Sequence, residues 1–171
     1  MPNELNNRRK QAIEYTHYFY TPKELNKEKW LEFTEEVKKL RFSLPKFTDT
    51  AGACYENEPL KLSGRDGEGE PHITNKTIWF NGEGENAHES FVLERKPQRA
   101  EHEQPDAKGL FFDCCKTARK PYDLLVCLVL ISLKNHFGDK VEVSSDGDID
   151  EWKPAVQHYE KVTGKKSTLE V

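Results

Sequence analysis

The sequence lacks two features that would point directly to a partner: a long apolar run and an excess of basic side chains. Its longest apolar stretch, residues 124–131, falls well short of the roughly 20 residues that a membrane-spanning helix needs. The N-terminal segment MPNELNNRRKQAIEY has no apolar core of the signal-peptide type. The 26 Lys and Arg residues are outnumbered by 30 Asp and Glu residues. We therefore expect a soluble, cytoplasmic protein that binds neither a membrane nor duplex nucleic acid, since duplex binding relies on neutralising phosphates.

Several motifs with known chemistry are also missing. No glycine-rich phosphate loop, HExxH zinc motif or GxSxG nucleophile elbow occurs, and no internal repeat is present. Acidic residues alternate in DGDIDE, as they do at the start of a calcium loop. However, Gly147 stands at the second position of that loop, and Gln157 stands where a bidentate Glu is required. The sequence therefore predicts no EF-hand, and the favoured interpretation includes no bound metal and no cofactor.

The composition favours one domain with a compact core and polar loops. A chain of 171 residues suits a single domain, and its apolar residues, 35% of the total, are clustered rather than dispersed. Residues 56–72 are rich in Gly, Pro and charged residues, and residues 97–108 are polar with two prolines, which predicts exposed, mobile loops. We interpret the four cysteines as reduced thiols, as expected in the cytoplasm: Cys54, Cys114, Cys115 and Cys127.

One helix dominates the predicted core. A helix is predicted over residues 121–137, and its residues 124–131 are apolar around the whole circumference. Pro121 suits its first turn, and Gly138 is a common stop signal. Asp123 complements the positive end of its dipole. A helix that is apolar on all sides must be buried on most of them. We therefore expect a sheet and flanking amphipathic helices to cover it.

The remaining elements complete an α+β pattern. An amphipathic helix is expected after Thr21, its predicted N-cap, with Pro22 in the first helical position, and a shorter helix is expected over residues 3–15. Period-two alternation and turn signals predict strands over residues 74–80, 90–95, 109–115 and 140–144. A last helix should begin near Asp150, after a cap by Asp148 or Asp150, and end near Gly164. The prediction is a small antiparallel, or mixed, sheet of about four strands, with an antiparallel meander over the first three of them.

A basic turn between a strand and the central helix is the first candidate site. The segment CCKTARKPYD places three cations and a hydroxyl just before the helix: Lys116, Thr117, Arg119 and Lys120. Helix N-termini present unpaired N–H groups and a partial positive charge, which favour phosphate or carboxylate groups. The alternative interpretation is a solvated basic turn that only ends the strand.

A second polar turn follows the last strand and contains Ser144, Ser145 and Asp146. If the strands before both turns are parallel, the turns emerge at the same sheet edge, where ligands commonly bind. Helix capping and a turn at Asp146 and Gly147 explain the acidic residues equally well without a ligand.

Three functions follow from these candidates, and the sequence favours a binder over an enzyme. The first is non-catalytic binding of a phosphorylated small ligand such as a nucleotide at the two turns. The second is a protein-interaction module, with a homo-oligomer as one form of it, that uses acidic loops and the aromatic cluster of Tyr15, Tyr18, Phe19 and Tyr20. The third is a metal-dependent phosphoesterase that uses His88, Glu89 and Asp146, with Asp113 as a further residue that could join the site.

Overall fold

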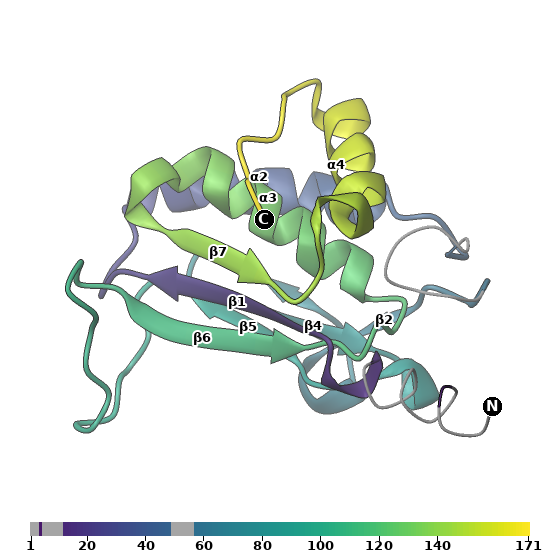
Figure 1. Cartoon of the computed structure of the whole chain (residues 1–171), viewed down its shortest axis with the longest axis horizontal. Helices are drawn as coiled ribbons and strands as arrows, with labels where there is room; N and C mark the ends of the chain where they lie inside the picture. Colours follow the sequence, from purple (N-terminus) through teal and green to yellow (C-terminus); the bar gives the residue numbers. More distant parts are fainter. Residues whose placement is uncertain (1–3, 5–11, 49–56) are drawn as a thin grey trace.

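The computed structural model describes residue 4, residues 12–48 and residues 57–171 (Figure 1). Cys54 and most of the helix predicted over residues 3–15 lie outside these ranges, although residues 12–14 are helical. The described part contains α-helices and two antiparallel sheets, so the predicted α+β class is confirmed. The single sheet of about four strands is replaced by two separate sheets.

The first sheet has three strands in the order β6-β1-β7, which span Phe111–Lys116, Thr16–Thr21 and Glu142–Ser145. The second sheet is built around β4, which pairs with β2 and β3 on one side and with β5 on the other. Its strands β2, β3, β4 and β5 span Leu62–Ser63, His72–Ile73, Thr77–Gly82 and Phe91–Glu94. Every pairing is antiparallel. Three short 3-10 helices, η1, η2 and η3, span Arg65–Gly67, Gly84–Asn86 and Gly138–Lys140.

The central helix is confirmed as α3, which spans Asp123–Phe137. It packs against α2 (Lys27–Phe42) and α4 (Ile149–Thr163), and the sheets lie on its other side (Figure 1). Its apolar side chains from residue 125 to residue 131 are all buried, as a helix without a polar face requires. Among the described residues, no helix has the length and apolar character needed to cross a membrane.

The predicted start of the second helix is wrong. Thr21 is the last residue of β1, where it pairs with Phe111, and α2 begins at Lys27. The N-cap is Asn26, whose side chain accepts a hydrogen bond from the Lys29 amide at 3.0 Å. Thr21 pairs in a strand and its side chain is buried there, so it does not cap a helix. The cap of α4 is Asp148, one of the two residues predicted for it.

Strand β1 was not predicted, and it reorganises the sheet. The expected hairpin between β4 and β5 is present, but β6 pairs with β1 rather than with β5, so the three-strand meander is wrong. Because β1 is antiparallel to both β6 and β7, those two strands run parallel to each other on either side of it. The region predicted as a mobile loop over residues 56–72 contains β2, η1 and β3.

Candidate functional site

The two predicted turns emerge at the same end of the first sheet. The Thr117 amide donates a hydrogen bond to the Tyr15 carbonyl at 3.1 Å, and the Asp146 amide donates to the Thr16 carbonyl at 3.0 Å. Both turns therefore meet the backbone at the start of β1, one from β6 and the other from β7. This is the arrangement expected from two parallel strands, with β1 inserted between them.

The functional groups of these turns are occupied by other parts of the protein. Arg119 Nη2 lies 2.6 Å from Glu151 Oε1, and its guanidinium stacks over the Tyr15 ring at 3.9 Å from the centroid. The Asp146 carboxylate accepts hydrogen bonds from the Thr16 amide at 3.0 Å and from the Tyr18 hydroxyl at 2.9 Å. Of the other predicted residues, Lys116 and Lys120 are half-buried and Ser144 is exposed. A phosphate bound between the two turns must compete with Glu151 for the Arg119 guanidinium.

Thr117 and Ser145 belong to a buried network behind the turns. Thr117 Oγ1 donates to Asp123 Oδ1 at 2.5 Å, and His17 lies between Asp123 (2.6 Å) and the Ser145 hydroxyl (2.8 Å). The Cys127 thiol donates to Asp123 Oδ2 at 3.4 Å. Burial favours the neutral form of Asp123, but His17 and the three hydrogen bonds outweigh it and lower the pKa of Asp123.

Within the described ranges, His17, Asp123 and Cys127 form the one group whose potential metal ligands all lie within 4.8 Å of one another. All three side chains are buried, and they already satisfy one another by hydrogen bonds. Burial and Asp123 raise the pKa of the Cys127 thiol well above its usual value, so it stays protonated. The network therefore joins β1, β7 and α3, and it offers no surface to a substrate.

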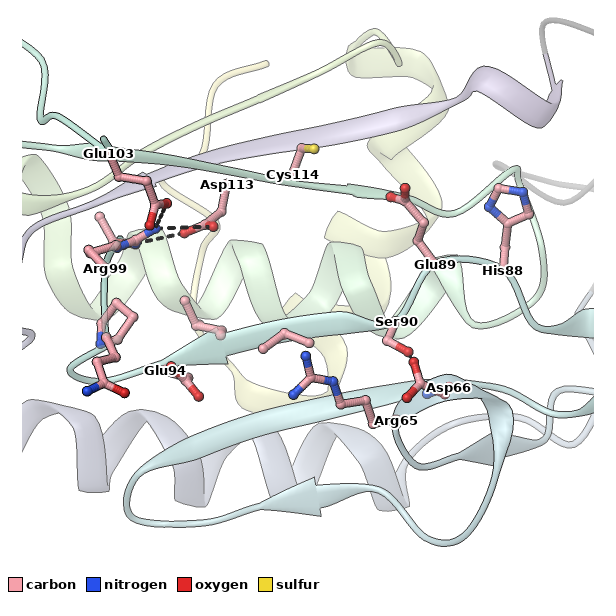
Figure 2. Close-up of a pocket in the computed structure, with 15 residues that line it drawn as sticks. Arg65, Asp66, His88, Glu89, Ser90, Glu94, Arg99, Glu103, Asp113 and Cys114 are labelled. Carbon is pink, nitrogen blue, oxygen red and sulfur yellow. Dashed lines mark hydrogen bonds and ion pairs between the residues drawn. The ribbon is translucent and has the colours of Figure 1, made fainter. Parts of the chain in front are cut away.

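A groove between β5 and β6 is lined by three of the predicted residues, His88, Glu89 and Asp113 (Figure 2). Its volume is about 670 Å³, within the range of roughly 300–1,000 Å³ typical of ligand sites. At one end, Lys116 is bonded to the start of β5: its amide donates to Glu89 Oε2 at 2.6 Å, and its carbonyl accepts from His88 Nδ1 at 2.8 Å. At the other end, Arg99 bonds Asp113 at 2.9 Å.

Both long walls of the groove are strand edges without a partner among the described residues. Just beyond the ends of the paired strands, the Arg95 amide donates to the carbonyl of Lys76, the residue before β4. Antiparallel alternation from this bond turns the N–H and C=O groups of Val92 and Glu94 toward the groove. Just after β6, the Thr117 amide donates to the carbonyl of Tyr15, the residue before β1, and the same alternation turns the backbone groups of Phe112 and Cys114 toward the groove. Two rows of backbone donors and acceptors therefore face each other.

The groove is acidic. Two arginines, Arg65 and Arg99, are outnumbered by five carboxylates in its lining: Asp66, Glu89, Glu94, Glu103 and Asp113. Burial raises the pKa of Asp113, and the bonded Arg99 guanidinium opposes that rise only in part. Burial, with Glu89 and Asp113 nearby, also raises the pKa of the Cys114 thiol. The lining favours a cationic ligand, and Cys114 is a protonated thiol rather than an activated nucleophile.

The residues of the phosphoesterase hypothesis are only partly brought together. His88, Glu89 and Asp113 line the groove, but Asp146 lies on the far side of β1 and is bonded to Thr16 and Tyr18. The Glu89 carboxylate is also occupied by the Lys116 amide.

Of the aromatic cluster, Tyr15 and Phe19 are buried, whereas Tyr18 and Tyr20 are half-buried and contact Phe112.

Sequence reasoning missed most of the groove, including Glu94, Arg99 and Glu103. The local signal was the run of charges from residue 94 to residue 103, of which residues 94 and 95 were interpreted as the end of a strand and residues 97–103 as the start of a mobile loop. Its position beside Asp113 depends on β6 pairing with β1, a contact between distant parts of the chain.

No family model, curated protein or solved structure matches this chain.

Proposed function

We propose that this chain is a protein-interaction module that binds an extended, basic segment of a partner in the groove between β5 and β6. The observation that carries the proposal is the pair of unpartnered strand edges facing each other across an acidic lining. A segment added as a strand gains main-chain hydrogen bonds from both edges. Carboxylates in the lining then select basic side chains by charge complementarity.

The directions of the walls suit one inserted strand. The start of β5 meets the end of β6, where the Glu89 amide donates to the Lys116 carbonyl at 3.3 Å. The loop after β5 returns to Asp113 through Arg99, so β5 and β6 run antiparallel. An added segment is therefore antiparallel to one wall and parallel to the other. Its alternate side chains point inward, toward Leu93 and Asp113, and outward beside Phe112.

Blocking one edge tests the mode of binding. The probe is a short fluorescein-labelled peptide of alternating threonine and arginine, followed by fluorescence anisotropy. The wild-type protein should bind this peptide and should not bind the matched peptide of threonine and glutamate. Val92→Pro removes an N–H group that faces the groove and not β4, so it should abolish binding while β4 pairing is kept. Val92→Ala keeps the N–H group and should bind normally.

Charge reversal tests the acidic lining. Glu94→Lys should weaken binding of the arginine peptide by about tenfold or more, and added salt should weaken binding to the wild type. Asp139→Lys makes the same charge change at an exposed residue outside the groove and should have no effect. Binding that survives both Val92→Pro and Glu94→Lys would exclude the groove. A dimer of this chain that Val92→Pro dissociates would make a second copy the occupant instead.

Binding of a phosphorylated small ligand at the two turns is the second candidate. The convergence of the segments after β6 and β7 supports it, and the ion pair between Arg119 and Glu151 opposes it. Glu151→Gln releases Arg119 from that ion pair but keeps a side chain able to complete the cap of α4. A nucleotide should then raise the melting temperature of Glu151→Gln more than that of the wild type, and Arg119→Ala should show no rise. If no nucleotide shifts any of these proteins, this candidate is excluded.

A further inference from the structure

One end of the groove already holds a guanidinium group (Figure 2). Arg99 Nη2 lies 2.9 Å from Asp113 Oδ2, and Arg99 Nη1 lies 3.4 Å from Asp113 Oδ1 and 3.5 Å from Glu103 Oε1. The guanidinium carbon lies 4.9 Å from the centroid of the Phe111 ring. A carboxylate that accepts from both nitrogens and an aromatic face together form a pocket suited to arginine.

The chemistry of this pocket discriminates between arginine and lysine. A planar guanidinium presents two parallel N–H groups to Asp113 while its face rests on Phe111. A lysine ammonium is a compact point charge that cannot make both contacts in the same way. We call the pocket formed by Glu103, Phe111 and Asp113 the arginine subsite.

Arg99 is an internal occupant of the arginine subsite, and it fits incompletely. It comes from the segment between β5 and β6, outside both walls of the groove. Its Nε atom is buried with no hydrogen-bond partner among the described residues, which carries a desolvation penalty. A guanidinium that enters along the groove can make the same contacts with Asp113 that Arg99 makes now. It avoids the desolvation penalty when its own Nε atom stays in contact with solvent.

We propose that the arginine subsite takes an arginine side chain of the bound segment in place of Arg99. This inference rests on the proposed function, and it defines the partner more closely: the segment presents arginine, not lysine, at the Asp113 end of the groove. Arg99 then acts as a tethered competitor that lowers the affinity for the partner.

A small probe tests the subsite without any partner. Arg99→Ala empties it, so Nα-acetyl-arginine amide should raise the melting temperature of this variant by at least about 2 °C at saturation. The same probe should shift the wild type less, because it must displace Arg99 from the subsite. The lysine and citrulline analogues are the controls and should shift neither protein. A variant that ignores the arginine probe, or that responds equally to the lysine probe, would overturn the proposal.

Peptides separate this inference from the proposed function. The threonine–arginine peptide should bind the wild type about tenfold more tightly than a threonine–lysine peptide of equal charge. Arg99→Ala should increase the affinity for the arginine peptide only. Equal affinities for the two peptides would refute the arginine subsite and leave the groove proposal intact. If Arg99→Ala responds to the small arginine probe but neither the wild type nor Val92→Ala binds any peptide, the arginine subsite is kept and the groove proposal is excluded.

A second variant covers the case in which Arg99→Ala does not fold. Asp113→Asn removes the charge that faces the guanidinium but keeps the shape of the side chain. It should abolish the preference for the arginine peptide over the lysine peptide. An unchanged preference in Asp113→Asn would overturn the assignment.

Discussion

Replacing Asp123 with Asn breaks the buried network at the start of α3. Asp123 is 2% exposed and accepts hydrogen bonds from His17 at 2.6 Å and from Thr117 at 2.5 Å. Asn has the same shape, but it carries no charge and has one acceptor oxygen instead of two. Breaking a buried pair costs about 3–5 kcal/mol, which is a large part of the roughly 5–15 kcal/mol that stabilises a typical domain. Urea unfolding should show this loss at an unchanged m value.

The pH dependence provides a second measurement on the same variant. The pKa of Asp123 is lowered in the folded protein, so its contribution is fully present above the unfolded value near about 3.9. That contribution is lost as the pH falls through the lower, folded value. The stability gap between the wild type and Asp123→Asn should therefore be constant near neutral pH and should narrow in acid.

The control for Asp123→Asn is Asp139→Asn, the same change at an exposed residue of η3. It should alter the free energy of unfolding by less than about 0.5 kcal/mol. A loss below about 1 kcal/mol for Asp123→Asn would refute the reasoning, because unpairing a buried charged group costs more than that. A difference in the free energy of unfolding between the wild type and Asp123→Asn that stays constant in acid would show that the charge of Asp123 does not stabilise the fold.

Three further substitutions test close packing, a buried hydrogen bond and an exposed side chain elsewhere in the fold. In Gly82→Ala the new Cβ would lie 2.0 Å from the Asn86 backbone oxygen, so the turn must shift and the protein should lose about 1–3 kcal/mol in thermal unfolding. Tyr159→Phe removes a hydrogen bond to Glu36, which links α2 to α4, and urea unfolding should show a loss of about 1–2 kcal/mol. Phe42→Ser changes a side chain that is 81% exposed and should stay within about 0.5 kcal/mol; a larger loss would mean that Phe42 is covered in solution.

Local patterns in the sequence were enough for most elements. The apolar run over residues 124–131, with Gly138 as a stop signal, predicted α3, and the cap at Asp148 predicted the start of α4. Alternation over residues 90–95 predicted β5, and the structure buries its alternate side chains Phe91 and Leu93 in the core. These predictions succeeded because helix and strand periodicity places side chains on a face without reference to distant residues.

The capping pattern at Thr21 shows where local reasoning stops. Thr21, Pro22 and Glu24 fit a helix start, yet pairing with Phe111 makes Thr21 the end of β1. A helix cap is worth about 0.5–2 kcal/mol, and a strand buried between two neighbours gains more from its ladders and side-chain packing. Whether Thr21 ends a strand or caps a helix depended on β6 and β7, which lie about 90 or more residues further along the chain.

The candidate sites divide in the same way. The sequence by itself determined the basic and acidic turns, the charges of residues 94–103 and the position of each on a strand end or loop. Only the tertiary structure decided that Arg119 pairs with Glu151 and that Arg99 pairs with Asp113. The physical reason is that β1, and not β5, pairs with β6, which brings both turns to one sheet end and leaves an acidic groove between two strand edges.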